Sequence, residues 1–212
     1  MATFAMASSS SVSDNDSINQ DMVFIRDVLP EAAILTLTPE IISFALLRTA
    51  YTRVQVRVIY KDGYPNKTPI VELTSKMLPV PLLKNKEKEC EALAGKHRGE
   101  PQLEHIFNFM YDFIQDNMFL PCWKEVKKVA AMCEGTDHKL GCDDKKGVLQ
   151  LRLRNGLYRQ SIDITVPPMY PEECVVVDFP AGNLPSSIMH VFKSHAEDIA
   201  RRCMAGFTPE AA

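Results

Sequence analysis

The chain has 212 residues, which corresponds to one large domain or to two domains of about 100 residues each. Hydrophobic residues make up 46% and charged residues 24%, a balance typical of a globular protein and not of a disordered or fibrous one. The formal net charge is −3, so no strong positive field exists to bind nucleic acid or an anionic membrane. Apolar runs are far shorter than the roughly 20 residues of a membrane span. These features favour protein partners.

The six cysteines are scattered through the chain without the density of a disulfide scaffold, which fits thiols that stay reduced. They occupy positions 90, 122, 133, 142, 174 and 203. The first residues, MATFAMASSSSVSDNDS, contain neither the basic start nor the sustained apolar run of a secretory signal. We therefore expect a protein of the cytoplasm, the nucleus or both.

The first half begins with a Ser-rich acidic tail over residues 1–16, which we expect to stay mobile. Ser17 is expected to cap a helix that ends at Pro30. Four strands then follow, the third of them marked by valines alternating with Arg and Gln. The predicted strands cover residues 33–38, 42–47, 52–60 and 70–74.

Helical periodicity replaces the strand pattern from residue 82 onward. One helix is predicted over residues 82–94 and a second from Pro101, with a broad apolar stripe. The stripe consists of Leu103, Ile106, Phe107, Met110, Phe113 and Ile114. A third helix is predicted from Pro121 to about residue 132.

The strand pattern returns in the second half. Alternating residues over 148–154 lead to Asn155-Gly156, a strong hairpin signal because both residues tolerate positive φ. A return strand over 162–166 and a further strand over 174–179 follow. Asn183 or Ser186 is expected to cap a last helix with an apolar face. That face carries Ile188, Val191, Phe192, His195 and Ile199.

One plan is used twice: a helix, antiparallel strands, a Tyr-Pro step into another strand, and a helix laid across the sheet. Tyr64-Pro65 and Tyr170-Pro171 mark the equivalent places. Strands that follow one another before the helices indicate an α+β fold with antiparallel pairing. We predict two modules, each an antiparallel sheet of about four strands covered by helices, with a degenerate second copy.

The order of elements around Tyr64-Pro65-x-x-x-Pro69, followed by two helices joined through Gly99-Glu100-Pro101, resembles an RWD domain. RWD domains are the non-catalytic relatives of ubiquitin-conjugating enzymes. The resemblance covers residues 17–120. Residues 121–205 resemble a second, degenerate copy through their topology and Tyr170-Pro171, and residues 206–212 form a tail.

This resemblance implies a non-enzymatic protein-interaction module or scaffold in the ubiquitin pathway or another regulatory context. Its partner is then a ubiquitin-conjugating enzyme, a ubiquitin ligase or a kinase, and neither nucleic acid nor a membrane. Another reading is an accessory domain whose RING or kinase partner is encoded elsewhere, since the second copy is one helix shorter than the first.

Cys90 carries the enzymatic alternative, a ubiquitin or ubiquitin-like conjugating enzyme with this thiol as the nucleophile. It lies at about the distance from Tyr64-Pro65 that such enzymes use, but the chain has no His-Pro-Asn segment to stabilise an oxyanion. The segment that contains Cys90 has the pattern of an amphipathic helix. We therefore expect Cys90 to be a buried packing residue.

A metal site built from cysteines is a further alternative. Cys122, Cys133, His138 and Cys142 offer four soft ligands, but their spacing matches no closed zinc motif. Cys122 and Cys133 stand about 16 Å apart along one predicted helix. The five histidines at 97, 105, 138, 190 and 195 have no neighbouring nucleophile in a recognised arrangement, and we expect no metal and no cofactor.

A surface that binds a protein partner is the remaining candidate for a functional site. Trp and Met are enriched at the centres of binding interfaces, and conspicuous apolar residues gather at two places. An alternative for the first group is that it joins the two halves. The candidate partner-binding residues are Met118, Phe119, Leu120 and Trp123 at the junction of the halves, and Met77 and Leu78 after the first Tyr-Pro strand.

Overall fold

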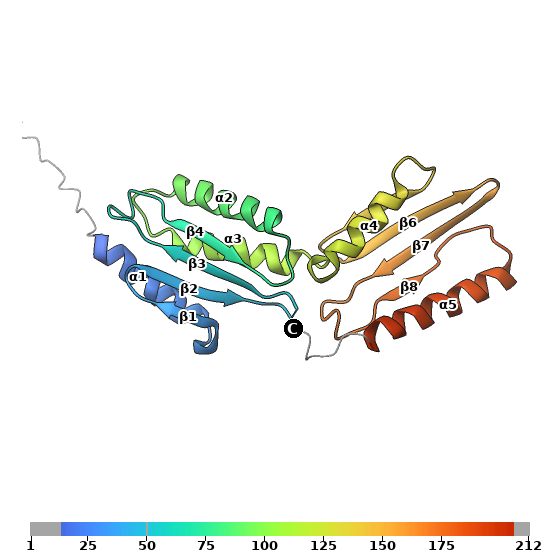
Figure 1. Ribbon diagram of the computed structural model, residues 1–212, viewed down its shortest axis with the longest axis horizontal. Coiled ribbons are helices and arrows are strands. Elements are labelled where there is room, and N and C mark those ends of the chain that lie inside the picture. The colour runs from blue at the N-terminus through green and yellow to red at the C-terminus, as the bar shows by residue number, and fades with distance from the viewer. Residues whose placement is uncertain (1–13, 50, 206–212) are drawn as a thin grey trace, which may run out of the picture. The chain divides into compact units, whose positions relative to one another are not determined.

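The computed structural model describes residues 14–49 and 51–205, and its architecture is α+β. Two four-stranded antiparallel sheets form, in the orders β1-β2-β3-β4 and β5-β6-β7-β8. Five α-helices accompany them within the described residues (Figure 1). The predicted fold class of two sheet-plus-helix modules is confirmed. Residues 1–13 of the tail expected over residues 1–16, and the whole tail expected over residues 206–212, lie outside the described residues.

Strands β2 and β3 and helices α2 and α3 all contribute buried side chains to the core beside the first sheet. The valines of β3 are fully buried and alternate with exposed or half-buried polar residues, as predicted. Phe44 of β2 meets Phe107 of α3 with ring centroids 5.8 Å apart. The elements are α1 (Asp14–Val28), β1 (Ile34–Leu37), β2 (Ile41–Leu46), β3 (Val54–Ile59), β4 (Ile70–Thr74), α2 (Val80–Lys96) and α3 (Leu103–Asp116).

The start of α1 differs from the prediction. Residues 14–16 are already helical, so Ser17 lies inside the helix instead of capping it. The Ser17 hydroxyl is buried without a hydrogen-bond partner. Two aspartates among residues 14–16 suit a helix N-terminus, where backbone N–H groups and the helix dipole attract negative charge. This explains why the helix extends one turn further.

A buried polar network ties α1 to the segment that links α2 and α3. The Asp21 carboxylate accepts hydrogen bonds from the hydroxyls of Tyr64 at 2.5 Å and Tyr60 at 2.9 Å. The Tyr64 hydroxyl in turn accepts one from the backbone N–H of Gln102 at 2.6 Å. The Gln102 side-chain amide donates to the Pro65 carbonyl oxygen at 2.5 Å. The first Tyr-Pro step is thereby anchored to the helices.

We predict that Asp21 makes stability depend on pH. Burial raises the pKa of its carboxyl from 3.8 to about 6, against the opposing effect of its hydrogen bonds. The folded state therefore holds the proton more tightly than the unfolded state, so this contribution is complete below about pH 4 and is lost as pH rises through 6. The loss amounts to about 3 kcal/mol.

Urea unfolding of the wild type and of Asp21→Asn between about pH 4 and pH 7 checks this prediction. The free energy of unfolding of the wild type should fall relative to that of the variant as pH rises. A difference between the two proteins that stays constant across this range contradicts the assignment, because the comparison cancels the titration of all other groups.

The second sheet is flanked by two helices next to opposite edge strands. Helix α4 contacts β5 and helix α5 contacts β8 (Figure 1). Its buried cluster is small and consists of Phe119, Cys122, Leu149 and Val166. The elements are α4 (Trp123–Cys133), β5 (Lys139–Asp143), β6 (Val148–Asn155), β7 (Tyr158–Thr165), β8 (Val176–Asp178) and α5 (Ser186–Ala205).

The β6–β7 hairpin forms where it is predicted, with a different turn. Asn155 pairs with Tyr158, so the two loop residues are Gly156 and Leu157. Only Gly156 has positive φ, at 59°, and Asn155 does not. Glycine at the first loop position with positive φ is the pattern of a type II′ turn, which matches the right-handed twist of the strands.

The described residues group into two compact units. The first comprises residues within 14–45, 55–74 and 83–109, and the second comprises 46–54, 75–82 and 110–205. The segment at Arg48 belongs to the second unit, where its guanidinium donates to the carbonyl oxygens of Ile114, Asn117 and Met118. No α-helix among the described residues has both the length and the apolarity needed to cross a membrane.

Candidate interaction surface

Helix α5 presents an apolar face that the described chain does not cover. The face consists of Ile188, Val191, Phe192 and Ile199, whose exposed fractions are 44, 57, 54 and 60%. His195, which the sequence places on this face, is exposed as well. The physical reason is that α5 contacts the edge strand β8, so its remaining surface has no sheet beneath it. Contiguous exposed apolar side chains are a common feature of interaction sites.

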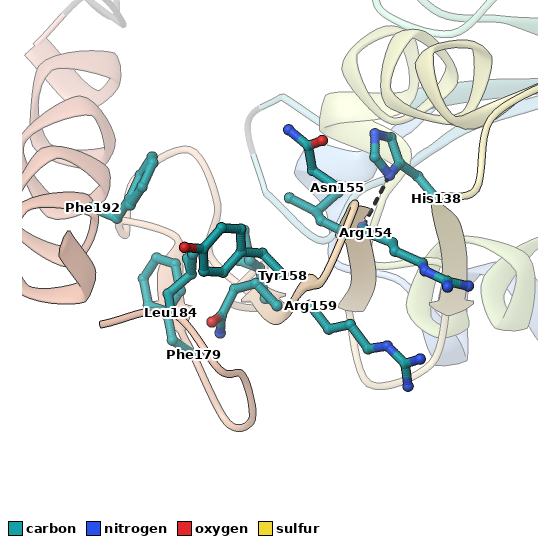
Figure 2. A pocket seen from close by; sticks show the side chains of 11 residues that line it. His138, Arg154, Asn155, Tyr158, Arg159, Phe179, Leu184 and Phe192 are labelled. Atoms are coloured by element: carbon teal, nitrogen blue, oxygen red, sulfur yellow. Dashed lines mark hydrogen bonds between the residues drawn. The ribbon is translucent and has the colours of Figure 1, made fainter. Parts of the chain in front are cut away.

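A pocket opens between the start of α5 and the end of the β6–β7 hairpin. Its volume is about 290 Å³, and Phe179, Leu184 and Phe192 contribute large apolar side chains to its wall. Figure 2 shows these three side chains and Tyr158 gathered on one side, between the helix and the hairpin. This volume is near the lower limit for small-molecule sites. We call it the α5 pocket, and its size suits one or two apolar side chains of a partner.

One part of the sheet beside this pocket is formed by Lys139, Arg152, Arg154 and Arg159, and we call it the cationic face. Asp143, Asp163 and Asp178 lie on the same side of the sheet further along the strands. Lys139 stands directly opposite Arg152, and Arg154 stands directly opposite Arg159. Because side chains two residues apart in a strand share a face, all four cations lie on the same side of the sheet.

These four side chains are exposed, and none of them forms an ion pair within residues 14–49 and 51–205. They line a hollow of about 380 Å³. Figure 2 shows the side chains of Arg154 and Arg159 directed away from the apolar group. Like charges placed opposite each other in a sheet are destabilising, so an anionic partner would relieve this repulsion.

The residues predicted to bind a partner at the junction of the halves are mostly internal. Phe119 and Leu120 are each 3% exposed, and Phe119 belongs to the core cluster of the second unit. Met118 is half-buried and its backbone N–H donates to the Asp144 carbonyl oxygen. Trp123 is half-buried at the start of α4, with Lys127 Nζ 4.9 Å from its ring centroid. Phe119 and Leu120 are therefore not available to a partner, and Phe119 packs within the core of the second unit.

Of the second predicted pair, only Met77 remains at the surface. Met77 is 41% exposed and Leu78 is 5% exposed. The Ser75 hydroxyl accepts hydrogen bonds from the backbone N–H groups of both residues, which fixes this turn. One exposed methionine does not make a patch.

The two Tyr-Pro motifs share the same backbone form. Tyr64-Pro65 and Tyr170-Pro171 both have cis peptide bonds. Pro65, Pro69 and Pro171 are buried, and Tyr170 is half-buried against the core cluster of the second unit. Both motifs therefore pack mainly into the protein interior, and only Tyr170 keeps part of its surface in solvent.

Cys90 lies in helix α2 and is fully buried. Burial raises the pKa of its thiol to about 12, so the thiol stays protonated at neutral pH. A nucleophilic cysteine requires an accessible thiolate with a lowered pKa. The nearby charge of Lys86 lowers this pKa, but the effect of burial is larger and opposes activation of the sulfur.

The four proposed soft metal ligands do not converge within the described chain. Cys122 is buried in the core cluster of the second unit, Cys133 is half-buried at the end of α4, and Cys142 is exposed on β5. His138 Nδ1 accepts a hydrogen bond from the Arg154 backbone N–H. These residues offer no common tetrahedral site.

Sequence reasoning missed both the α5 pocket and the cationic face. The pocket depends on where α5 lies against the hairpin, which no local pattern encodes. The cationic face has a signal in the alternation of Arg152 and Arg154, but Lys139 and Arg159 join it only through the strand register.

Comparisons of the chain with protein-family models, with curated proteins and with solved structures gave no match.

Proposed function

We propose that this chain is a non-enzymatic protein-interaction module of the tandem RWD-like type. The observation that carries the proposal is the uncovered apolar face of α5 next to the α5 pocket. Burying this face against a partner would remove apolar area from water, the main favourable contribution to protein association.

The partner in this proposal carries an apolar anchor for the α5 pocket and acidic residues for the cationic face. Leu184 and Phe192 would contact the anchor, while Arg154 and Arg159 would attract the acidic flank. Complementary charge would mainly increase the rate of association and its sensitivity to salt. From the resemblance to RWD domains, we propose that the partner is a ubiquitin-conjugating enzyme, a ubiquitin ligase or a kinase. The interaction would take place in the cytoplasm or nucleus.

The burial and raised pKa of Cys90 support a function without catalysis. A thioester assay with ubiquitin, activating enzyme and ATP, resolved without reductant, tests this part of the proposal. We expect no adduct. An adduct that reductant removes and that Cys90→Ser abolishes would make the protein a conjugating enzyme.

Affinity capture from cell extract, followed by binding measurements with the purified captured protein, tests the surface. We predict that Phe192→Asp weakens binding at least tenfold, because a charge would enter the apolar contact. Met132→Asp is the matched control, since Met132 is a 75% exposed methionine on α4. Equal binding by wild type and Phe192→Asp, or equal loss in both variants, would refute this surface.

A charge reversal tests the expected chemistry of the partner. Arg154→Glu together with Arg159→Glu should slow association, and the wild-type rate should fall as salt is added. Both residues are exposed, so the reversal should leave the fold intact. An association rate that is independent of salt and of both arginines would contradict an acidic partner.

A further inference from the structure

Three side chains with metal-binding atoms converge where α2 gives way to α3. His97 follows the last residue of α2, Glu100 lies in the connection, and His105 is in the first turn of α3. One ligand atom from each lies within 4.8 Å of the other two. The imidazole rings of His97 and His105 are stacked, with centroids 3.6 Å apart and planes at 16°.

The three side chains are free to bind a ligand. Within residues 14–49 and 51–205, none of them forms a hydrogen bond or an ion pair with another side chain or with the backbone. Both histidines are half-buried and Glu100 is exposed, so the group is accessible from solvent. Two imidazoles and a carboxylate otherwise gain nothing from this proximity beyond ring stacking.

The backbone that carries these side chains is held in place by hydrogen bonds to the buried Tyr64-Pro65 segment. The Gly99 N–H donates to the Pro65 carbonyl oxygen at 3.1 Å, and Gln102 is fixed by its backbone bond to Tyr64 and its side-chain bond to Pro65. A site whose supporting shell is already rigid loses little freedom when it binds.

We propose that His97, Glu100 and His105 form a binding site for Zn²⁺. Two histidines and one glutamate are a known zinc donor set, and three protein ligands leave the fourth position open for water or a partner group. Tetrahedral Zn²⁺ with bonds of about 2.0–2.1 Å places its ligand atoms about 3.4 Å apart. Zn²⁺ binds in the plane of each imidazole, so the stacked and nearly parallel rings of His97 and His105 do not both bind it as they lie. At least one ring must turn about χ2, a torsion with broad preferences in histidine, for the ion to bind. The bound ion would link the end of α2 to the start of α3.

Calorimetric titration of the metal-free full-length chain with Zn²⁺ tests the site. The titration uses a chain in which Cys133, Cys142, Cys174 and Cys203 are replaced by Ser, so that these thiols do not compete for the metal. We call this chain the parent, and the ligand variants are made in it. We expect one equivalent to bind. His97→Gln with His105→Gln should lower the affinity at least about 100-fold, because two of three ligands are lost. His190→Gln, an exposed histidine on α5, is the matched control and should change nothing.

Thermal unfolding supplies a second measurement. Zn²⁺ should raise the Tm of the parent chain with increasing concentration and leave that of the double-histidine variant unchanged. Equal metal-free Tm values would show that the variant folds. Should it not fold, Glu100→Gln replaces it, since Glu100 is exposed, and it should weaken binding about 10-fold or more. Absence of binding by the parent, or unchanged binding by both ligand variants, would overturn the proposal.

Discussion

Replacing Tyr64 by phenylalanine is expected to lower the free energy of unfolding by about 4 kcal/mol. Tyr64 is 1% exposed. Its hydroxyl donates a hydrogen bond to Asp21 and accepts one from the Gln102 backbone N–H. Phenylalanine keeps the ring but leaves the buried N–H without a partner and removes one donor from the buried carboxyl. An unmatched buried polar group costs about 1–3 kcal/mol, and more where a charge is involved.

Urea unfolding followed by circular dichroism measures this loss, and hydrogen exchange at the start of α3 localises it. Tyr60→Phe should cost less, about 1–2 kcal/mol, since Tyr60 makes one bond to Asp21 and Tyr64 still donates. Tyr158→Phe is the control, because Tyr158 is 53% exposed. If Tyr64→Phe were no more destabilising than Tyr158→Phe, the network would not stabilise the first unit.

Gly147→Ala is expected to destabilise the second unit by a similar amount, about 4 kcal/mol. Gly147 has φ of 65°, a conformation unfavourable for alanine. An added Cβ would lie 2.6 Å from the Val166 carbonyl oxygen and 2.9 Å from Met118 Cβ. The turn cannot move away easily, because Val166 N–H donates to the Gly147 carbonyl oxygen and Met118 N–H donates to that of Asp144.

Gly156→Ala separates the clash from the backbone cost. Gly156 has φ of 59°, but an added Cβ would meet no atom within 4 Å. Only the conformational cost remains there, about 1–2 kcal/mol. Equal destabilisation by the two substitutions, measured by urea unfolding, would show that the contacts of Gly147 are not tight in solution.

The sequence predicted elements best where a local period carries the information. The valines of β3 alternate over six residues, and the α3 stripe recurs at helical spacing, so neighbouring residues alone identify a strand and a helix. The ends of the helices and strands were predicted less accurately than their interiors. Ser17 is an example, because Asp14 and Asp16 before it also suit a helix N-terminus.

The residues of the candidate sites could not be predicted well from the sequence, and the reason is physical. Trp123 and its neighbours stand out in the sequence, yet Phe119 and Leu120 are internal, since the second unit has few other large side chains for its core. The α5 face has the periodicity of a buried stripe, but α5 contacts an edge strand and leaves the stripe in solvent.

By itself, the sequence determined the α+β class, the strand and helix order, the repeated Tyr-Pro step and the burial of Cys90. Each of these depends on residues within a few positions of one another. Only the tertiary structure decided which faces stay uncovered and which distant side chains meet. Lys139 joins Arg152 through strand register, and His97 meets His105 through the turn between two helices. Such juxtapositions depend on strand register and on the path of the connecting turn, which leave no period in the chain.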